Sequence, residues 1–268
     1  VKCGIVGLPN VGKSTLFNAL TKSGIAAENY PFCTIEPNIG IVEVPDARMQ
    51  ALADIVKPQR MQYATTEFVD IAGLVAGASK GEGLGNQFLA TIRETDGIVN
   101  VVRCFEDDNV VHVAGKVDPI SDIATIVTEL ALADLTTVEK AQERNVKLVR
   151  SGDKDAAKLG ELLVQVAACL NEGKPARTLK LDPAQRALLK PLCLLTMKPV
   201  MYVANVAEKG FANNPLLTRV EEYAAHEGAP VVAICAALES EIAVLSDEEK
   251  REFLADIGMT EPGLNRLI

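Results

Sequence analysis

A glycine-rich stretch near the N-terminus has the residue types and the spacing of a phosphate-binding loop. It reads GIVGLPNVGKSTLFNAL from Gly4 to Leu20 and contains the pattern GxxxxGK[ST] from Gly7 to Ser14. Its glycines let successive backbone N–H groups turn toward an anion, and the helix expected next adds its positive N-terminal end. The alternative is a tight turn that caps an ordinary helix. Apolar residues before the loop and helix formers after it favour phosphate binding.

Two side chains of this loop could carry chemistry. Lys13 can reach the outer phosphates of a nucleotide, and the hydroxyl of Ser14 can occupy one coordination position of Mg²⁺. We therefore expect the phosphates to be bound by the residues at the end of the loop, namely Asn10, Val11, Gly12, Lys13, Ser14 and Thr15.

A second pattern could sense the terminal phosphate. Asp70-Ile71-Ala72-Gly73 follows a strand-like run, which would place Asp70 near Mg²⁺ and the Gly73 amide near the γ-phosphate. Glycines at positions 77, 81, 83 and 85 follow, so we interpret the segment as a mobile switch, with a flexible surface loop as the alternative. Thr34 is the only Ser or Thr between Asn29 and Asn38, and it is either the third Mg²⁺ ligand beside Ser14 and Asp70 or an ordinary turn threonine.

A third pattern bears on the base of the nucleotide. Guanine-specific NTPases carry NKxD, whose aspartate accepts hydrogen bonds from guanine, but this chain has Asn205-Val206-Ala207-Glu208. The lysine is missing and the glutamate is one methylene longer, so the donors of guanine are no longer met in the same place. Because unpaired buried polar groups discriminate strongly, guanine selectivity should be impaired. We place Asn205, Val206, Glu208 and Ala236 in the nucleotide site, with an ordinary strand-end loop as the alternative.

The elements that must position these residues indicate an α/β fold with a mainly parallel sheet. Helical patterns separate most of the short apolar, β-branched runs, which typifies crossover connections. The interval from Asp70 to Asn205 is more than twice the roughly 60 residues that two βαβ steps need. Two helical patterns around a turn at Ser151–Asp153 predict an inserted antiparallel helical hairpin, and Asp182-Pro183 begins a further short helix. The expected strands are 3–7, 39–44, 66–70, 98–104, 200–205 and 231–236.

Composition limits the class of protein. The chain has 268 residues, a formal net charge of -9 and six cysteines without a C-x-x-C pair, so we expect reduced thiols in or near the core rather than zinc or disulfides. No signal peptide is visible, and lysines and prolines interrupt the most apolar stretch, 187–206. We expect a cytoplasmic protein that binds neither membranes nor specific DNA sequences.

The stretches GLPNVGKS, YPFCTIEPN and DIAGLVAGASKGEGLG together resemble the Obg-related branch of the Ras-like P-loop NTPases, and within it the YchF family of Obg-like ATPases. The resemblance extends over the helical insert to the terminal EPGLNRLI. It implies a Ras-like domain, 1–118 and 199–268, interrupted by a helical domain, 119–198. It also implies a preference for ATP, a ribosomal or RNA partner, and a small TGS domain that would follow the end of this sequence, which suggests a truncated chain.

The residue that positions water for hydrolysis is not identified by a local motif in this sequence. Ras-like enzymes orient the attacking water with a glutamine that follows Asp-x-x-Gly, and here that position is Leu74, so intrinsic hydrolysis should be slow. The resemblance implies a catalytic histidine at His112, although a histidine on a strand surface is the alternative. Asn10 either helps to bind K⁺ beside the phosphates or stabilises the loop. The expected catalytic set is thus His112, Lys13, Asn10 and Gly73.

Basic residues mark one face of the insert. Segment 139–190 carries 11 Lys or Arg against seven Asp or Glu in an otherwise acidic chain. Within it, Lys140, Arg144, Lys147 and Arg150 are spaced to share one helical face, which would suit an RNA backbone. Glu139 and Glu143 lie beside them, so a solvated helix is the alternative. Our hypothesis is an Mg²⁺-dependent ATPase switch; the alternatives are a GTPase and a nucleotide-gated binding protein whose hydrolysis is incidental.

Overall fold

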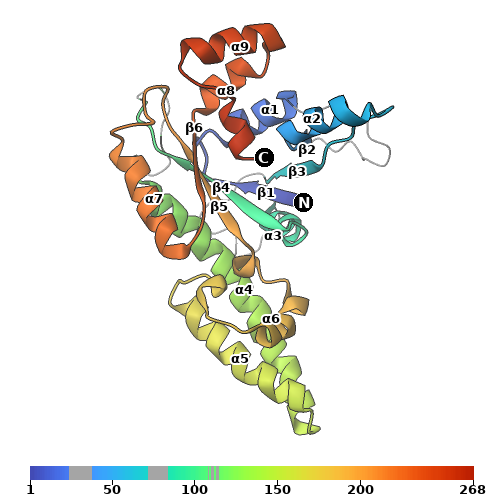
Figure 1. Ribbon diagram of the computed structural model, residues 1–268. Coiled ribbons are helices and arrows are strands. Elements are labelled where there is room, and N and C mark those ends of the chain that lie inside the picture. Colours follow the sequence, from blue (N-terminus) through green and yellow to red (C-terminus); the bar gives the residue numbers. More distant parts are fainter. Residues whose placement is uncertain (24–37, 72–83, 108, 110–111, 113–114) are drawn as a thin grey trace.

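The computed structural model describes residues 1–268 except 24–37, 72–83, 108, 110–111 and 113–114 (Figure 1). Two predicted site residues, Thr34 and Gly73, therefore lie outside the described residues. The same holds for Leu74 and for most of the glycine-rich segment that follows it.

Six strands of the described chain form one sheet in the order β2-β3-β1-β4-β5-β6. Neighbouring strands are parallel except for β2 and β3, which are antiparallel. The mainly parallel sheet is thus confirmed, because chain segments rich in helix separate most of the strands and permit crossovers. The strands are β1 (Lys2–Val6), β2 (Ile39–Glu43), β3 (Thr65–Asp70), β4 (Gly97–Arg103), β5 (Val200–Asn205) and β6 (Val231–Ile234).

Each expected strand is present, but the last one is shorter than its apolar run. β6 ends at Ile234, Cys235 is the N-cap of the next helix, and Ala236 is the first residue of that helix. The backbone N–H of Ala236 is therefore free of the sheet and available to the loops at its edge, which matters for the site described below.

Helices cover the two faces of the sheet and bury two apolar clusters. Leu16 and Ile92 contribute to one cluster, whereas Val220 and Leu254 contribute to the other. These clusters hold the strands in fixed register, so the loops at the strand ends keep their relative positions. Among the helices that contribute to these clusters are α1 (Lys13–Ser23), α3 (Leu84–Arg93), α7 (Pro215–Glu227), α8 (Ala236–Ile242) and α9 (Asp247–Asp256), with the short helix η6 (Gly263–Arg266) near the C-terminus. Helix α2 (Ala47–Val56) has no buried residue.

The inserted helical hairpin is confirmed. It consists of α4 (Pro119–Arg150) and α5 (Lys154–Asn171), and in Figure 1 α4 extends away from the sheet with α5 alongside its far half. Asp182 forms a capping box that starts α6 (Pro183–Leu189), as the Asp182-Pro183 pair predicts, and Asp118 caps α4 in the same way before Pro119. The remaining short helices are η3 (Ala176–Thr178), η4 (Lys190–Leu192) and η5 (Leu195–Met197).

The long helix α4 contributes residues to three apolar clusters. Its first turns pack under the sheet through Ile123 and Ile126, whereas Val138 packs with Leu163 and Leu194 in a third cluster inside the insert. One continuous helix therefore ties the insert to the sheet, and the domain limits 119–198 stay a prediction.

Cys33 lies outside the described residues, and the other cysteines follow expectation with one exception. Cys104, Cys169 and Cys235 are buried thiols and Cys3 is half-buried, but Cys193 is exposed. Cys193 follows η4 with a φ of 46°, and this left-handed position turns it out of the core. The expectation of a thiol in or near the core was wrong for that residue. Among the helices of the described chain, none has the length and apolar character needed to cross a membrane.

Candidate nucleotide-binding site

A cavity of about 700 Å³ opens where the carboxyl ends of several parallel strands meet. Ligands of open α/β sheets bind at this edge, because loops from separate strands converge there. The glycine-rich loop after β1 forms one wall, and residues that follow β3, β4, β5 and β6 form the others. The described lining residues are Gly7, Leu8, Pro9, Asn10, Gly12, Lys13, Ser14, Thr15, Asp70, Phe105, Asp107, Asn205, Ala236 and Ala237.

The loop takes a conformation that depends on glycine. Gly12 has a φ of 94°, and a Cβ atom there would lie 2.1 Å from Nδ2 of Asn205. A Cβ at Gly7 would lie 2.9 Å from the carbonyl oxygen of Val101. Asn10 also has a positive φ, 63°, a region that asparagine tolerates better than most residues. The first helical hydrogen bond, from the Leu16 amide to the Gly12 carbonyl at 3.0 Å, begins α1 directly after the loop.

Asn205 joins the loop to the far side of the cavity. Its Nδ2 donates to the carbonyl oxygen of Val11 at 2.9 Å, and its Oδ1 accepts from the backbone N–H of Ala236 at 3.0 Å. The side chain is buried, so both bonds are shielded from water. Asparagine suits this position because its amide has one donor and one acceptor end. Three residues predicted from separate motifs are thereby held together.

Lys13 and Asp70 form an ion pair across the cavity. Their side chains are 12% and 20% exposed, so the pair is only partly solvated and its charges attract each other strongly. Ser14, the next residue of the loop, is exposed on the same wall. A lysine, a hydroxyl and a carboxylate, the groups required for a nucleotide phosphate and its cation, are therefore neighbours.

Two of the predicted base-binding residues do not line the cavity. Val206 is buried in the apolar cluster under β5, and its backbone N–H donates to the carbonyl of Ile234 at 2.9 Å. Glu208 is exposed beyond the end of β5. Val11 likewise contributes its carbonyl oxygen rather than a side chain.

Sequence reasoning missed an aromatic residue on the cavity wall. Phe105 follows β4, and the guanidinium of Arg103 lies 4.6 Å from the centre of its ring. Arg103 is buried and its Nε donates to the Phe105 carbonyl at 3.1 Å, which fixes the loop. Asp107 and Ala237 were missed as well. An aromatic side chain just past the carboxyl end of a central strand was the available signal for Phe105.

His112 is buried rather than placed on a strand surface, so that alternative is wrong. β4 ends at Arg103, and the His112 ring is enclosed where α4 begins. Its Nε2 lies 2.9 Å from Oδ2 of Asp122 in the first turn of α4. Burial raises the pKa of the Asp122 carboxyl, and the hydrogen bond from His112 partly opposes this shift. His112 is not among the described lining residues of the cavity.

Within the described ranges, no three or more His, Cys, Asp or Glu side chains are grouped as a metal-binding cluster. The predicted Mg²⁺ ligands are of a different kind, since a hydroxyl and a carboxylate would share the cation with phosphate oxygens. Ser14 and Asp70 both line the cavity.

Known proteins resemble the chain over its whole length. A family described as "50S ribosome-binding GTPase" matches residues 2–140. A protein of Haemophilus influenzae named "Ribosome-binding ATPase YchF" is 63% identical over 267 residues, which cover 100% of this chain and 74% of that protein. A Bacillus subtilis protein with the same name is 54% identical over 268 residues, 99% of this chain and 73% of that protein.

Solved structures support the same assignment. The "YchF GTPase" of Schizosaccharomyces pombe superimposes with a TM-score of 0.86 at 35% sequence identity, covering 100% of this chain and 73% of that one. A "GTP binding protein" of Pyrococcus horikoshii shares the fold alone, with a TM-score of 0.57 and 19% identity over 100% of this chain and 78% of that one. The phosphate-binding loop, the sheet order and these similarities agree, and the chain belongs to the YchF family of P-loop NTPases.

Proposed function

We propose that this protein binds and hydrolyses ATP with Mg²⁺ and that its nucleotide state controls its binding to the ribosome. Relatives that are 63% and 54% identical are named ribosome-binding ATPases, and Lys13, Ser14 and Asp70, which could bind phosphate and its cation, line the cavity. The activity would operate in the cytoplasm.

The observation that carries the choice of ATP is the arrangement at the end of β5. Asn205 is used structurally, because its amide bonds the Val11 carbonyl and the Ala236 N–H. Two residues that would read guanine are changed, since Val206 and Glu208 stand at the positions where lysine and aspartate occur in guanine-specific enzymes, and Glu208 lies exposed outside the cavity. A guanine base would leave its ring donors unpaired there, a loss that penalises binding.

Lys13 and Asp70 separate their roles when a triphosphate binds. Lys13 turns to the outer phosphates, where it meets more negative charge than one carboxylate provides, and Asp70 is then free for the cation. Ser14 and Asp70 would hold the Mg²⁺, with Thr34 as its third protein ligand, and the ion would offset the charge that develops on the phosphates. The Gly73 amide would face the γ-phosphate. The carboxylate and hydroxyl oxygens on the cavity wall fit a hard cation of this kind.

His112 is the catalytic residue that we assign to hydrolysis, because Leu74 cannot hydrogen-bond to water. Asp122 is its positioning residue: the contact at 2.9 Å selects which ring nitrogen carries a proton and holds the ring in one orientation. Asn10, which has a positive φ and lines the cavity, is the candidate for binding K⁺ beside the phosphates.

A GTPase is the second candidate. The matching family is described as a GTPase and the Schizosaccharomyces pombe structure is titled a GTPase, so the names of the relatives differ on the nucleotide. A nucleotide-gated binding protein with incidental hydrolysis is a third candidate, motivated by Leu74.

Competition titrations separate the first two candidates. The purified chain would be titrated with fluorescent ATP in the presence of Mg²⁺, and unlabelled ATP or GTP would then displace the probe. We expect ATP to bind at least several-fold tighter; equal affinity or tighter GTP binding would overturn the ATPase assignment.

Ribosome pelleting addresses the third candidate. Binding would be compared with ADP, with ATP and with a non-hydrolysable ATP analogue. Binding that differs between ADP and the analogue supports a switch. A variant that binds ATP but cannot hydrolyse it would also be tested. If this variant binds and releases ribosomes as the wild-type protein does, hydrolysis is incidental.

A further inference from the structure

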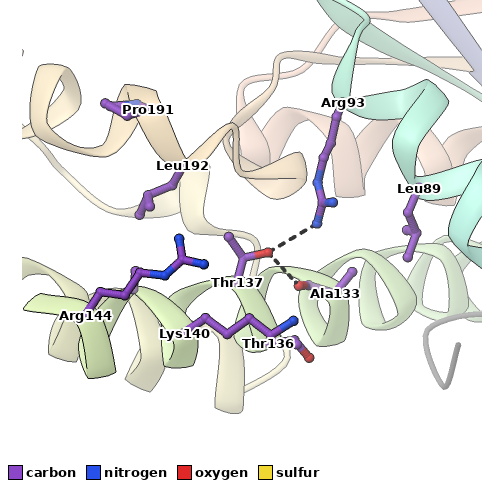
Figure 2. Close-up of a pocket in the computed structure, with 10 residues that line it drawn as sticks. Leu89, Arg93, Ala133, Thr136, Thr137, Lys140, Arg144, Pro191 and Leu192 are labelled. Carbon is purple, nitrogen blue, oxygen red and sulfur yellow. Dashed lines mark hydrogen bonds between the residues drawn. The ribbon is translucent and has the colours of Figure 1, made fainter.

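A groove separate from the nucleotide cavity lies where α3 meets the inserted hairpin (Figure 2). Its volume is about 450 Å³. The end of α3 forms one side, the exposed face of α4 forms the floor, and the short helix η4 closes the third side. The lining residues are Leu89, Arg93, Ala133, Thr136, Thr137, Lys140, Ala141, Arg144, Pro191 and Leu192.

The charged residues of this lining are all cationic. Arg93, Lys140 and Arg144 come from two separate helices, and Figure 2 shows their side chains extending into the same space. The described lining contains no carboxylate. Two exposed acids of α4, Glu139 and Glu143, occupy positions outside it. A locally cationic groove on a chain with a net charge of -9 favours an anionic ligand.

Hydrogen bonds fix the position of the α3 wall. Nη2 of Arg93 donates to Oγ1 of Thr137 at 3.2 Å, and that hydroxyl donates to the carbonyl of Ala133 at 3.2 Å. Nζ of Lys198 donates to the Arg93 carbonyl at 3.1 Å, at the end of α3 where a cation is favourable. These bonds hold Arg93 in position on the wall of the groove.

The floor of the groove is equally well anchored. Asp134, buried in α4, accepts from the backbone N–H groups of Leu195 and Thr196, each at 2.8 Å. The oxygens of this carboxylate are occupied by these donors and by the Thr196 hydroxyl at 2.6 Å. It therefore holds α4 against the rest of the insert, and it is not among the residues that line the groove.

The cationic row continues past the groove along α4. Lys147 and Arg150 are exposed and follow Arg144 at intervals of three residues. From Lys140 to Arg150 the row spans about 15 Å at 1.5 Å per residue. A row of this length matches a polymer with regularly spaced charges better than a single small anion. Guanidinium groups also bind phosphate oxygens through two parallel N–H bonds, a geometry that lysine alone does not provide.

We propose that the groove formed by Arg93, Lys140 and Arg144 binds the phosphate backbone of RNA. The inference rests on the proposed function, since it names the face by which the protein would contact the RNA of a ribosome. It adds that α3, the helix next after the Asp70 segment, supplies part of that face. The hydroxyl of Thr136 already donates to the Leu132 carbonyl, but its oxygen can accept from a ribose hydroxyl.

RNA binding would be measured by fluorescence anisotropy with a labelled single-stranded RNA oligonucleotide over a series of salt concentrations. The variants are Arg93→Gln and the pair Lys140→Gln with Arg144→Gln; Lys158→Gln, an exposed lysine of α5 outside the groove, is the matched control. We expect the pair to lower affinity about tenfold or more at low salt and to reduce the slope of log K against log salt by about 1.4. Arg93→Gln should reduce the slope by about half of that, and the control should leave it unchanged.

Two further measurements make the result decisive. Poly-glutamate, an acidic polypeptide, would be tested as a competitor: displacement of RNA at equal charge concentration would show a general anionic site and overturn RNA as the specific occupant. Unchanged RNA affinity in all groove variants would overturn the site itself. ATP affinity would be measured on the same samples to separate the RNA-binding proposal from the ATPase proposal. The groove variants should bind ATP normally. If the ATPase assignment is wrong, the wild-type protein itself will fail to prefer ATP.

Discussion

The side-chain amide of Asn205 donates a hydrogen bond to the carbonyl oxygen of Val11 at 2.9 Å, although 194 residues separate the two in sequence. The same side chain accepts from Ala236, so one asparagine connects the ends of β1, β5 and β6. The nucleotide cavity therefore has a shape that depends on this residue as well as on the glycine-rich loop.

Asn205→Asp should weaken ATP binding more than it weakens the fold. The carboxylate can still accept from Ala236, but it cannot donate to Val11 and places negative charge against that carbonyl. Loss of a buried bond of this kind costs about 1–3 kcal/mol, or roughly 5- to 150-fold in affinity. Isothermal titration with ATP would measure it, with Asn18→Asp, an exposed position on α1, as the control. Wild-type affinity in Asn205→Asp would show that the bridge does not shape the site.

Glu208→Asp should move the ratio of ATP to GTP affinity toward GTP without reversing it. The shorter side chain restores the aspartate of guanine-specific loops, but Val206 still stands where the stem of a lysine would pack beside the base. Competition titrations with both nucleotides provide the measurement, and Glu222→Asp on the exposed face of α7 is the control. An unaltered ratio would mean that Glu208 takes no part in base selection, in keeping with its exposed position.

Binding and hydrolysis should separate at Lys13 and His112. Lys13→Ala removes the partner of Asp70 and the cation for the outer phosphates, so triphosphate affinity should fall. His112→Ala should leave ATP affinity near wild type and lower kcat by roughly 10²-fold, as expected for a positioned catalytic group. Titration with a non-hydrolysable ATP analogue and single-turnover hydrolysis would report the two effects. Normal hydrolysis by His112→Ala would assign the residue a structural role.

Asp122→Asn tests how His112 is held. The amide oxygen can still accept from the ring, but a neutral amide holds the ring less firmly than a carboxylate, so kcat should fall while KM changes little. A purely structural role of Asp122 would lower thermal stability and leave kcat of the folded protein unchanged.

The free energy of unfolding of the Glu239→Gln variant should increase relative to that of the wild type as pH rises. Burial raises the pKa of Glu239 above 4.5, so the native state keeps a proton that the unfolded chain has released, and wild-type stability falls as pH rises through that interval. Oε1 accepts from the Gly263 N–H at 2.7 Å, a bond that glutamine can keep, while Oε2 has no hydrogen-bond partner among the described residues.

Urea unfolding at pH 4 and pH 7 would measure this difference in the free energy of unfolding. Glu241→Gln, an exposed position on the same helix, is the control. If the stability of the wild type and that of Glu239→Gln depend on pH in the same way, ionisation of the buried carboxyl does not destabilise the protein.

The sequence by itself determined the parts of this protein that depend on local chemistry. Gly7, Gly12, Lys13 and Ser14 are read from one short stretch, because the turn, the donors and the helix start are neighbours in the chain. The strands and the hairpin follow from periodicity, since burial on one face repeats with the period of the element itself. The missing lysine before Glu208 likewise needs no tertiary structure to be noticed.

Only the tertiary structure decided which distant residues share a surface. Nothing in the local pattern pairs His112 with Asp122 or places Phe105 on the wall of the cavity. Arg93 joins Lys140 and Arg144 in one groove solely because α3 packs against α4. Such contacts arise when separate apolar faces bury each other, and the geometry of that packing depends on the whole chain rather than on the residues that happen to meet.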